Sequence, residues 1–264
     1  AEHAFANGDP PAGLQHLDAL MRVAPATQGP VLAALMPAMA EAPFRAAMVE
    51  ALRRDPPWRH ALPAALRAEG TPADAAQALL VDLMDAGTLR PAEMAVRVDL
   101  LDRSGRHAPA RAEWLATVGS GPPATGLVYD GGFEHPLFSG SGYGWRWREP
   151  AGVAMGMDPV EPFEGERAMA IRFQGRAVRF ANLAQFLVLE PGDYRLEASA
   201  SNGVDGERPF AWDIRCTADG RSLLDLPLMM EDGWQTVRGS FTVPPGCLRQ
   251  ELRLRHTGRS LAER

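Results

Sequence analysis

The sequence predicts two separate domains, an α-helical repeat domain over residues 1–118 and an antiparallel β-sandwich or jelly roll over residues 127–264. In the first half, Ala, Leu and Met recur at helical spacing, which is typical of amphipathic helices. In the second half, apolar and polar residues alternate, which is typical of strands with one buried face. Between the halves, residues 119–126 are rich in Gly and Pro and predict a linker.

Short apolar segments between Pro and Gly breaks predict the helices. The first follows Asp9-Pro10-Pro11, because Asp caps the first N–H groups of a helix and Pro fits its first turn. Such short helices cannot bury an apolar face alone, so stacked helix pairs are expected, although no regular 34-residue period is visible. The other helices are expected over residues 29–42, 43–54, 57–68, 72–86, 91–103 and 107–118.

Alternating segments separated by turn signals predict the strands. The alternation is clear over residues 168–173, 194–200, 210–216 and 248–255. Turn signals such as Asn202-Gly203 separate these segments. About seven short strands with regular turns indicate a sandwich or jelly roll of antiparallel sheets.

Composition and motifs argue against several classes of protein. The formal net charge of −6 argues against a nucleic-acid partner. No apolar run approaches the roughly 20 residues needed to span a bilayer, and no signal peptide is visible at the start. The sequence holds no phosphate-binding loop, metalloprotease motif or nucleophile elbow, so we expect a protein that is not an enzyme and needs no cofactor. The acids Glu161, Glu164 and Glu166 leave open a carboxylate pair for glycoside hydrolysis.

The two cysteines, Cys216 and Cys247, leave two alternatives open. A disulfide requires Cα atoms within about 7 Å of each other, and a bridge would favour a periplasmic or exported protein. The other alternative is a pair of buried free thiols.

Several segments resemble known families. Residues 127–134 (Leu-Val-Tyr-Asp-Gly-Gly-Phe-Glu), followed by Gly144-Trp145, resemble the opening of carbohydrate-binding modules of the galactose-binding-like jelly-roll type. Residues 105–114 resemble the closing helix of a tetratricopeptide repeat. The combination is similar to proteins associated with bacterial exopolysaccharide assembly or export. This resemblance implies a bacterial polysaccharide ligand, a protein partner for the helical domain and a periplasmic or cell-envelope location.

The resemblance also implies an aromatic sugar-binding site, because sugars stack their C–H faces on aromatic rings. In an alternating strand, Tyr143, Trp145 and Trp147 would share one face and Arg146 would lie on the other. Trp234 follows a turn and is a further candidate. The alternative is that at least one of these tryptophans belongs to the core.

Three further groups of residues carry expectations. Related modules often hold a structural Ca²⁺ with an early glutamate, here Glu134, but the last predicted strand has no acid at the usual place. Trp212 is expected in the core. Arg249, Arg253 and Arg255 line the polar face of the last strand, and they either face solvent or bind an acidic polysaccharide or a protein partner.

The sequence therefore predicts a non-catalytic polysaccharide-binding and scaffolding protein. The alternative is a structural subunit whose jelly roll contacts other proteins and binds no sugar, and a glycan-cleaving enzyme ranks third. A groove with accessible aromatic side chains would favour the first of these hypotheses.

Overall fold

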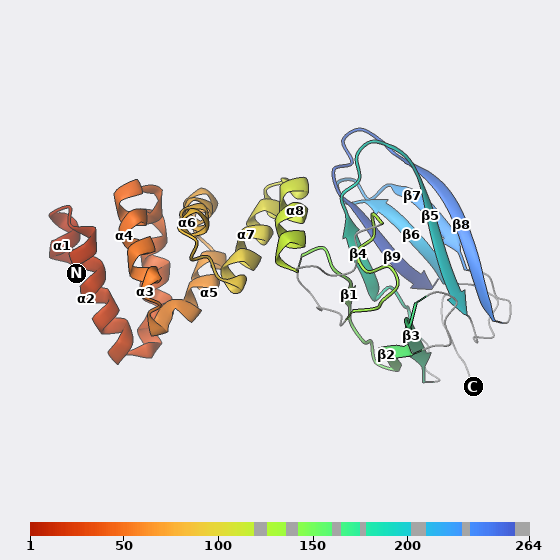
Figure 1. Cartoon of the computed structure of the whole chain (residues 1–264), viewed down its shortest axis with the longest axis horizontal. Coiled ribbons are helices and arrows are strands. Elements are labelled where there is room, and N and C mark those ends of the chain that lie inside the picture. The colour runs from red at the N-terminus through yellow and green to blue at the C-terminus, as the bar shows by residue number, and fades with distance from the viewer. Residues whose placement is uncertain are drawn as a thin grey trace. The chain divides into compact units, whose positions relative to one another are not determined.

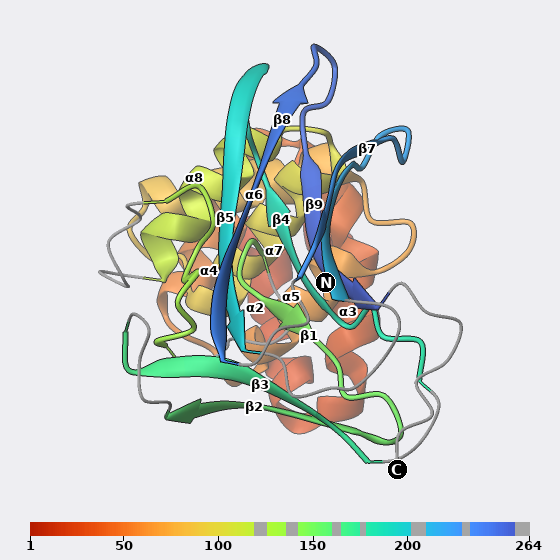
Figure 2. The same cartoon turned by 90° about the vertical axis from the view of Figure 1, so that its right-hand side faces the viewer.

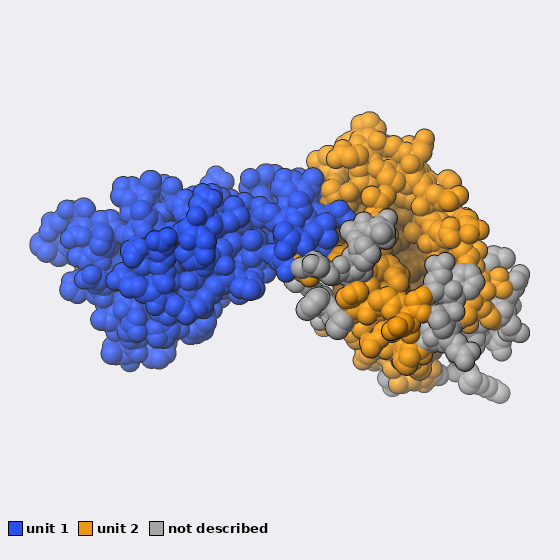
Figure 3. Space-filling model, viewed as in Figure 1, with its two compact units in different colours: residues 1–117 blue, residues 118–264 orange. Residues whose placement is uncertain are grey.

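The computed structural model describes residues 1–118, 126–135, 142–159, 165–174, 178–201, 210–228 and 233–256. The chain forms two compact units, Ala1–Thr117 and Val118–Arg264 (Figure 3). Helices make up the first unit and antiparallel sheets the second, which confirms the predicted fold class. Most of the predicted linker, and the predicted turn at Asn202-Gly203, lie outside the described residues. No described helix has the length and apolar character needed to cross a bilayer.

Eight α-helices and three short 3₁₀ segments form the first unit. The helix start predicted at Asp9 is confirmed, since the Asp9 carboxylate accepts a hydrogen bond from the Ala12 N–H at 3.1 Å. The elements are α1 (Glu2–Ala6), α2 (Pro10–Val23), η1 (Pro25–Thr27), α3 (Gln28–Leu35), η2 (Met36–Ala40), α4 (Ala42–Arg53), η3 (Pro57–Ala61), α5 (Leu62–Arg67), α6 (Ala73–Asp85), α7 (Pro91–Arg103) and α8 (His107–Thr117).

Two predicted helices are each divided in the structure. The segment 29–42 becomes α3 followed by η2, and the segment 57–68 becomes η3 followed by α5. Pro37 and Pro63 lie in the first turn of the second piece in each case. Because proline has no N–H to donate to the preceding turn, the helix cannot continue through it unchanged.

The helices stack as successive pairs. Helix α2 packs on α4 and α4 on α6, while α3 packs on α5 and α5 on α7 (Figure 1). Helices α2, α4, α6 and α8 begin at residues 10, 42, 73 and 107, so the intervals are 32, 31 and 34 residues. The stacking of the predicted pairs therefore follows a near-regular repeat that the sequence pattern alone does not reveal.

Three ion pairs join the helix pair α4–α5, with η3 between its helices, to the pair α6–α7. Arg45 binds Asp82, Arg59 binds Glu93 and Arg67 binds Asp99, across separations of 37, 34 and 32 residues. These separations are about one repeat, so each arginine binds an acid that lies roughly one repeat further along the chain.

The pair between Arg59 and Glu93 is buried, with side chains 4% and 1% exposed. The guanidinium donates two hydrogen bonds of 2.8 Å to the carboxylate. It also donates to the carbonyl oxygens of Leu52 at 2.8 Å and Thr88 at 2.6 Å. Glu93 accepts a further bond from the Arg90 N–H at 2.9 Å, so it also caps the start of α7.

The second unit contains a five-stranded sheet and two two-stranded sheets. The five-stranded sheet has the order β1-β4-β9-β6-β7, and the two-stranded sheets are β2–β3 and β5–β8. Both are called hairpins below, although β6 and β7 lie between β5 and β8 in the sequence. The β5–β8 hairpin extends along one face of the sheet, and β2–β3 crosses near its lower end (Figure 2). The strands are β1 (Arg146–Trp147), β2 (Val153–Pro159), β3 (Arg167–Phe173), β4 (Leu183–Leu187), β5 (Gly192–Ser201), β6 (Phe210–Cys216), β7 (Ser222–Pro227), β8 (Trp234–Val243) and β9 (Gln250–His256).

The alternation predicted for the last strand is confirmed. Leu252 and Leu254 of β9 are buried against the hairpins, whereas Arg253 and Arg255 point to the other side of the sheet. The face that carries the leucines is called the inner face below, and the opposite one the outer face.

Side-chain amides and a disulfide hold the segments that leave the sheet. The amide of Gln185 on β4 exchanges two hydrogen bonds of 2.8 Å with the backbone of Tyr129, as a neighbouring strand would. Gln250 on β9 binds the Leu189 N–H at 3.0 Å in the same manner. A disulfide joins Cys216 at the end of β6 to Cys247 in the loop before β9, with Cα atoms 5.5 Å apart. Of the two alternatives left open by the sequence, the bridged one is present.

Candidate functional site: an aromatic hollow

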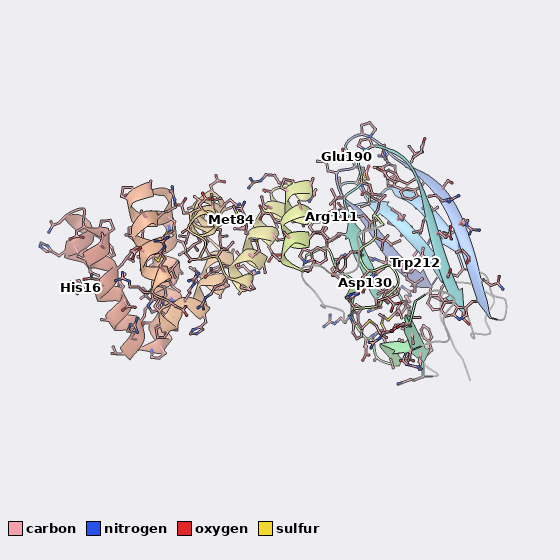
Figure 4. All side chains as sticks on the ribbon, in the orientation of Figure 1. His16, Met84, Arg111, Asp130, Glu190 and Trp212 are labelled. Atoms are coloured by element: carbon pink, nitrogen blue, oxygen red, sulfur yellow. A yellow bond between two sulfur atoms is a disulfide. The ribbon has the colours of Figure 1, made fainter. Side chains whose placement is uncertain are left out.

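A hollow of about 380 Å³ lies between the inner face of the five-stranded sheet and the two hairpins. This volume falls within the range of roughly 300–1,000 Å³ that is usual for ligand pockets. Its floor comes from β4, β6 and β9, and its sides come from β3, β5 and the segment 128–133. Trp212, which is labelled in Figure 4, lines the hollow together with residues of β5.

The open edge of β5 forms one side of the hollow. Six consecutive residues, 196–201, line it. Because side chains of a strand alternate between faces, consecutive residues can line one cavity only along the edge of the strand. Among the described strands, β5 pairs with β8 alone, so its other edge carries backbone N–H and C=O groups toward the hollow.

Three aromatic rings form a continuous wall. The ring of Trp145 lies between those of Phe133 and Trp212, with centroid distances of 4.8 Å and 5.8 Å. The Trp145 indole N–H donates to the carbonyl oxygen of Asp130 at 2.9 Å. Trp145 is therefore buried against two other rings and hydrogen-bonded at its N–H, and it supports the wall more than it offers a free face to a ligand.

Two other tryptophans line the hollow and are only half-buried. Trp212 lies on β6, and Trp234 lies at the start of β8, paired with Ser201 at the end of β5. Trp212 therefore belongs to the floor of the hollow, and Trp234 belongs to the end of the β5–β8 hairpin. A half-buried indole that lines a cavity can present a ring face to a ligand.

The structure does not bring all the predicted aromatic residues together. Tyr143 and Trp145 are buried, at 2% and 3% exposure, and only Trp145 and Trp234 of the predicted set line the hollow. Trp147 is half-buried on the inner face and packs against the core. The expected alternating strand is wrong, since β1 contains only Arg146 and Trp147.

Arg146 lies away from this hollow. It is on the outer face, opposite Ala184 of β4, while Trp147 beside it is opposite the inner-face residue Leu183. Trp212, which the sequence assigns to the core, does pack against it but also lines the hollow. The alternation of Phe210, Trp212 and Ile214 correctly gives the face of Trp212, but it cannot show that the hairpins leave part of this face open.

Polar side chains cover the exposed face of β5 and β8 beside the hollow. Glu197 of β5 and Arg238 of β8 form a two-fold hydrogen-bonded pair, at 2.8 and 3.1 Å. The hydrogen bond from Arg238 lowers the pKa of Glu197, so this carboxylate stays charged and is a poor proton donor. Ser199 and Thr236 exchange a hydrogen bond of 3.0 Å across the same hairpin.

The predicted calcium ligand has a role within the protein. One oxygen of Glu134 accepts hydrogen bonds from the backbone N–H groups of Glu166 at 2.9 Å and Arg167 at 3.4 Å. Asp130 in turn accepts a bond from the Glu134 N–H at 2.9 Å. Across the described segments, no three His, Cys, Asp or Glu side chains gather as a metal site would require. The acids Glu161 and Glu164 lie outside the described residues.

Replacing Gly165 by Ala should destabilise this end of the β unit by about 1–3 kcal/mol. A Cβ at Gly165 would lie 1.9 Å from the Glu134 carboxylate, and the residue has a φ of +85°. The measurement is the free energy of unfolding from urea denaturation. Gly233→Ala is the matched control, because Gly233 has a φ of +81° and nothing within 4 Å of its Cβ position. Equal losses in the two variants would show that the contact with Glu134 contributes nothing.

Comparisons with known proteins identify no family. No protein-family model matches the chain, and no curated protein matches it. Among solved structures, the enzymatically active domain of tailspike protein 4 from bacteriophage CBA120 is similar over 44% of this chain, with 16% sequence identity and a TM-score of 0.30. The match covers 17% of the tailspike chain, so this chain corresponds to a small part of it. A similarity at this level carries no argument about function.

Proposed function

We propose that this protein is a non-catalytic glycan-binding and scaffolding protein of the bacterial cell envelope, and that the glycan binds in the aromatic hollow of the β unit. The observation that carries the proposal is the combination of Trp212 and Trp234 with the open edge of β5 around one cavity. Ring faces suit the C–H surfaces of a sugar, and backbone N–H and C=O groups suit its hydroxyls.

The disulfide between Cys216 and Cys247 supports the proposed location. Disulfides persist in oxidising compartments such as the periplasm and are rare in the cytosol. The helical unit would supply the scaffold, because stacked helix pairs offer extended surfaces for a protein partner. In this proposal the protein takes part in the assembly or export of an exopolysaccharide.

Trp234→Ala should weaken glycan binding by at least about tenfold, equivalent to ~1.4 kcal/mol. The residue lines the hollow and is half-buried, so its removal takes away a stacking surface without opening the core. The full chain is first screened on an array of neutral bacterial polysaccharides. Titration calorimetry with a bound glycan then compares the wild-type protein with the variant.

Trp234→Phe is the matched control, because it keeps an aromatic face and should retain most of the affinity. Unchanged far-ultraviolet circular dichroism establishes that both variants fold. If no polysaccharide binds, or if Trp234→Ala binds as well as the wild type, the proposal fails. The structural-subunit hypothesis would then take its place.

A further inference from the structure

The outer face of the five-stranded sheet carries a second group of residues that the hollow does not use. Four arginines point outward from its strands: Arg146 on β1, Arg215 on β6, and Arg253 and Arg255 on β9. Arg249, just before β9, lies over the ring of Phe186 on the same face. The sheet separates this surface from the hollow, so the two can bind different groups.

Fewer acids than arginines lie on the strands of this face. Glu251 accepts hydrogen bonds from Arg146, at 2.7 Å, and from Arg253. Asp213 pairs with Arg215 and Arg255. Asp225 accepts a bond from Arg255 at 2.5 Å. Among the described residues of the five strands, four guanidiniums therefore face three carboxylates, although the whole chain has a net charge of −6.

An aromatic ring holds two of these guanidiniums in place. The Arg146 guanidinium lies 3.6 Å from the centroid of the Phe186 ring, and that of Arg249 lies 4.2 Å from it. Stacking on a ring fixes the plane of a guanidinium without neutralising its charge. These two guanidiniums are therefore held in a fixed orientation on this face.

The exposed arginines are open to a ligand. Arg215 and Arg253 have side chains that are 48% and 40% exposed, and Arg146 is 31% exposed. Arg215 uses its Nε for Asp213, so the outer edge of its guanidinium faces solvent. A guanidinium edge with two N–H groups matches a carboxylate.

We infer that this outer face is a second binding site, for a linear acidic polysaccharide of the uronate type. The charges are spread over one face of a sheet instead of converging on a pocket, which suits a long polyanion. Arg146 and Arg253 lie two strands apart, which is roughly 10 Å at a strand spacing of ~4.8 Å. A uronan carries one carboxylate on every sugar unit and can therefore meet several guanidiniums along its length.

An acidic protein fits this face less well. The hot spots of protein interfaces are enriched in Trp and Tyr as well as in Arg. The exposed large apolar side chains of the described residues are Leu20, Val23, Met84, Leu127 and Leu248. None of them is aromatic or lies on these five strands, and only Leu248, which precedes Arg249, is next to them in the sequence. Phe186, which could serve as an anchor, is covered by the two guanidiniums.

The double variant Arg215→Gln, Arg253→Gln should raise the Kd of the full chain for polygalacturonate by about tenfold. Binding is measured by affinity electrophoresis at low salt, and it should weaken as salt is added. Asp225→Asn, which removes an exposed acid from the same face, should tighten binding several-fold.

The matched control is Arg53→Gln, Arg172→Gln. These arginines are 53% and 61% exposed, each pairs with an acid, and neither lies on the outer face, so the change in net charge is identical. The control and Trp234→Ala should both bind polygalacturonate as the wild type does. If the two double variants lost the same affinity for polygalacturonate, the inference would be overturned. It would also be overturned if the wild type bound poly-glutamate as tightly as polygalacturonate, because that result would indicate a protein partner. If Trp234→Ala bound neutral glycans as well as the wild type does, this result would contradict only the proposed site in the hollow and not the site on the outer face.

Discussion

Replacing Glu93 by Ala should lower the free energy of unfolding of the helical unit by about 3–5 kcal/mol. The substitution leaves the Arg59 guanidinium, which is 4% exposed, without its counter-ion in a site closed to water. It also removes the acceptor for the Arg90 N–H at the start of α7. Urea denaturation followed by far-ultraviolet circular dichroism, which is dominated by the helices, measures the loss.

Two variants separate this effect from a general loss of charge pairing. Asp99→Ala breaks the pair with Arg67, whose side chains are both 39% exposed, and should cost no more than about 1 kcal/mol. Arg59→Met combined with Glu93→Leu should recover most of the lost stability, because no unpaired buried charge remains. A loss for Glu93→Ala as small as that for Asp99→Ala would contradict the burial of this pair.

Removal of the disulfide by Cys216→Ser, Cys247→Ser should destabilise the β unit by about 3–4 kcal/mol. The bridge closes a loop with a sequence separation of 31 residues, and it ties the end of β6 to the loop that leads into β9. Opening it frees that loop in the unfolded chain and loosens the centre of the five-stranded sheet. Hydrogen exchange followed by mass spectrometry on peptides from β6 and β9 measures the local change.

The helical unit serves as the internal reference for this experiment. Both cysteines belong to the β unit, so a reducing agent added to the wild type should increase exchange in β6 and β9 and leave α4 and α6 unchanged. Unaltered exchange in β6 and β9 after reduction would refute the stabilising role of the bridge.

The secondary structure was largely predictable because it depends on local patterns. Alternation in the last strand correctly assigned Leu252 and Leu254 to one face and Arg253 and Arg255 to the other. Helix ends at internal prolines such as Pro37 were harder to predict, because proline is also common in the first turn of a continuing helix. The repeat was hidden because equivalent helices share spacing and packing but little recognisable sequence.

The candidate site was only partly predictable, because it depends on contacts between distant segments. Trp145 and Trp234, which the sequence predicts for the site, do line the hollow, but Tyr143 is buried and Arg146 lies on the opposite face of the sheet. Trp212 resembled a core residue because its neighbours along β6 are core residues. Only the arrangement of the hairpins over the sheet determines which inner-face side chains stay accessible.

The near-regular spacing of α2, α4, α6 and α8 has a consequence for how such a chain can change in evolution. Each helix pair contacts its neighbours, and each cross-pair arginine reaches about one repeat forward. Duplication or deletion of a whole unit of about 32 residues would keep these partners in register, whereas a shorter insertion within a pair would misalign them. The helical half can therefore vary in length by whole units while the β half keeps its architecture.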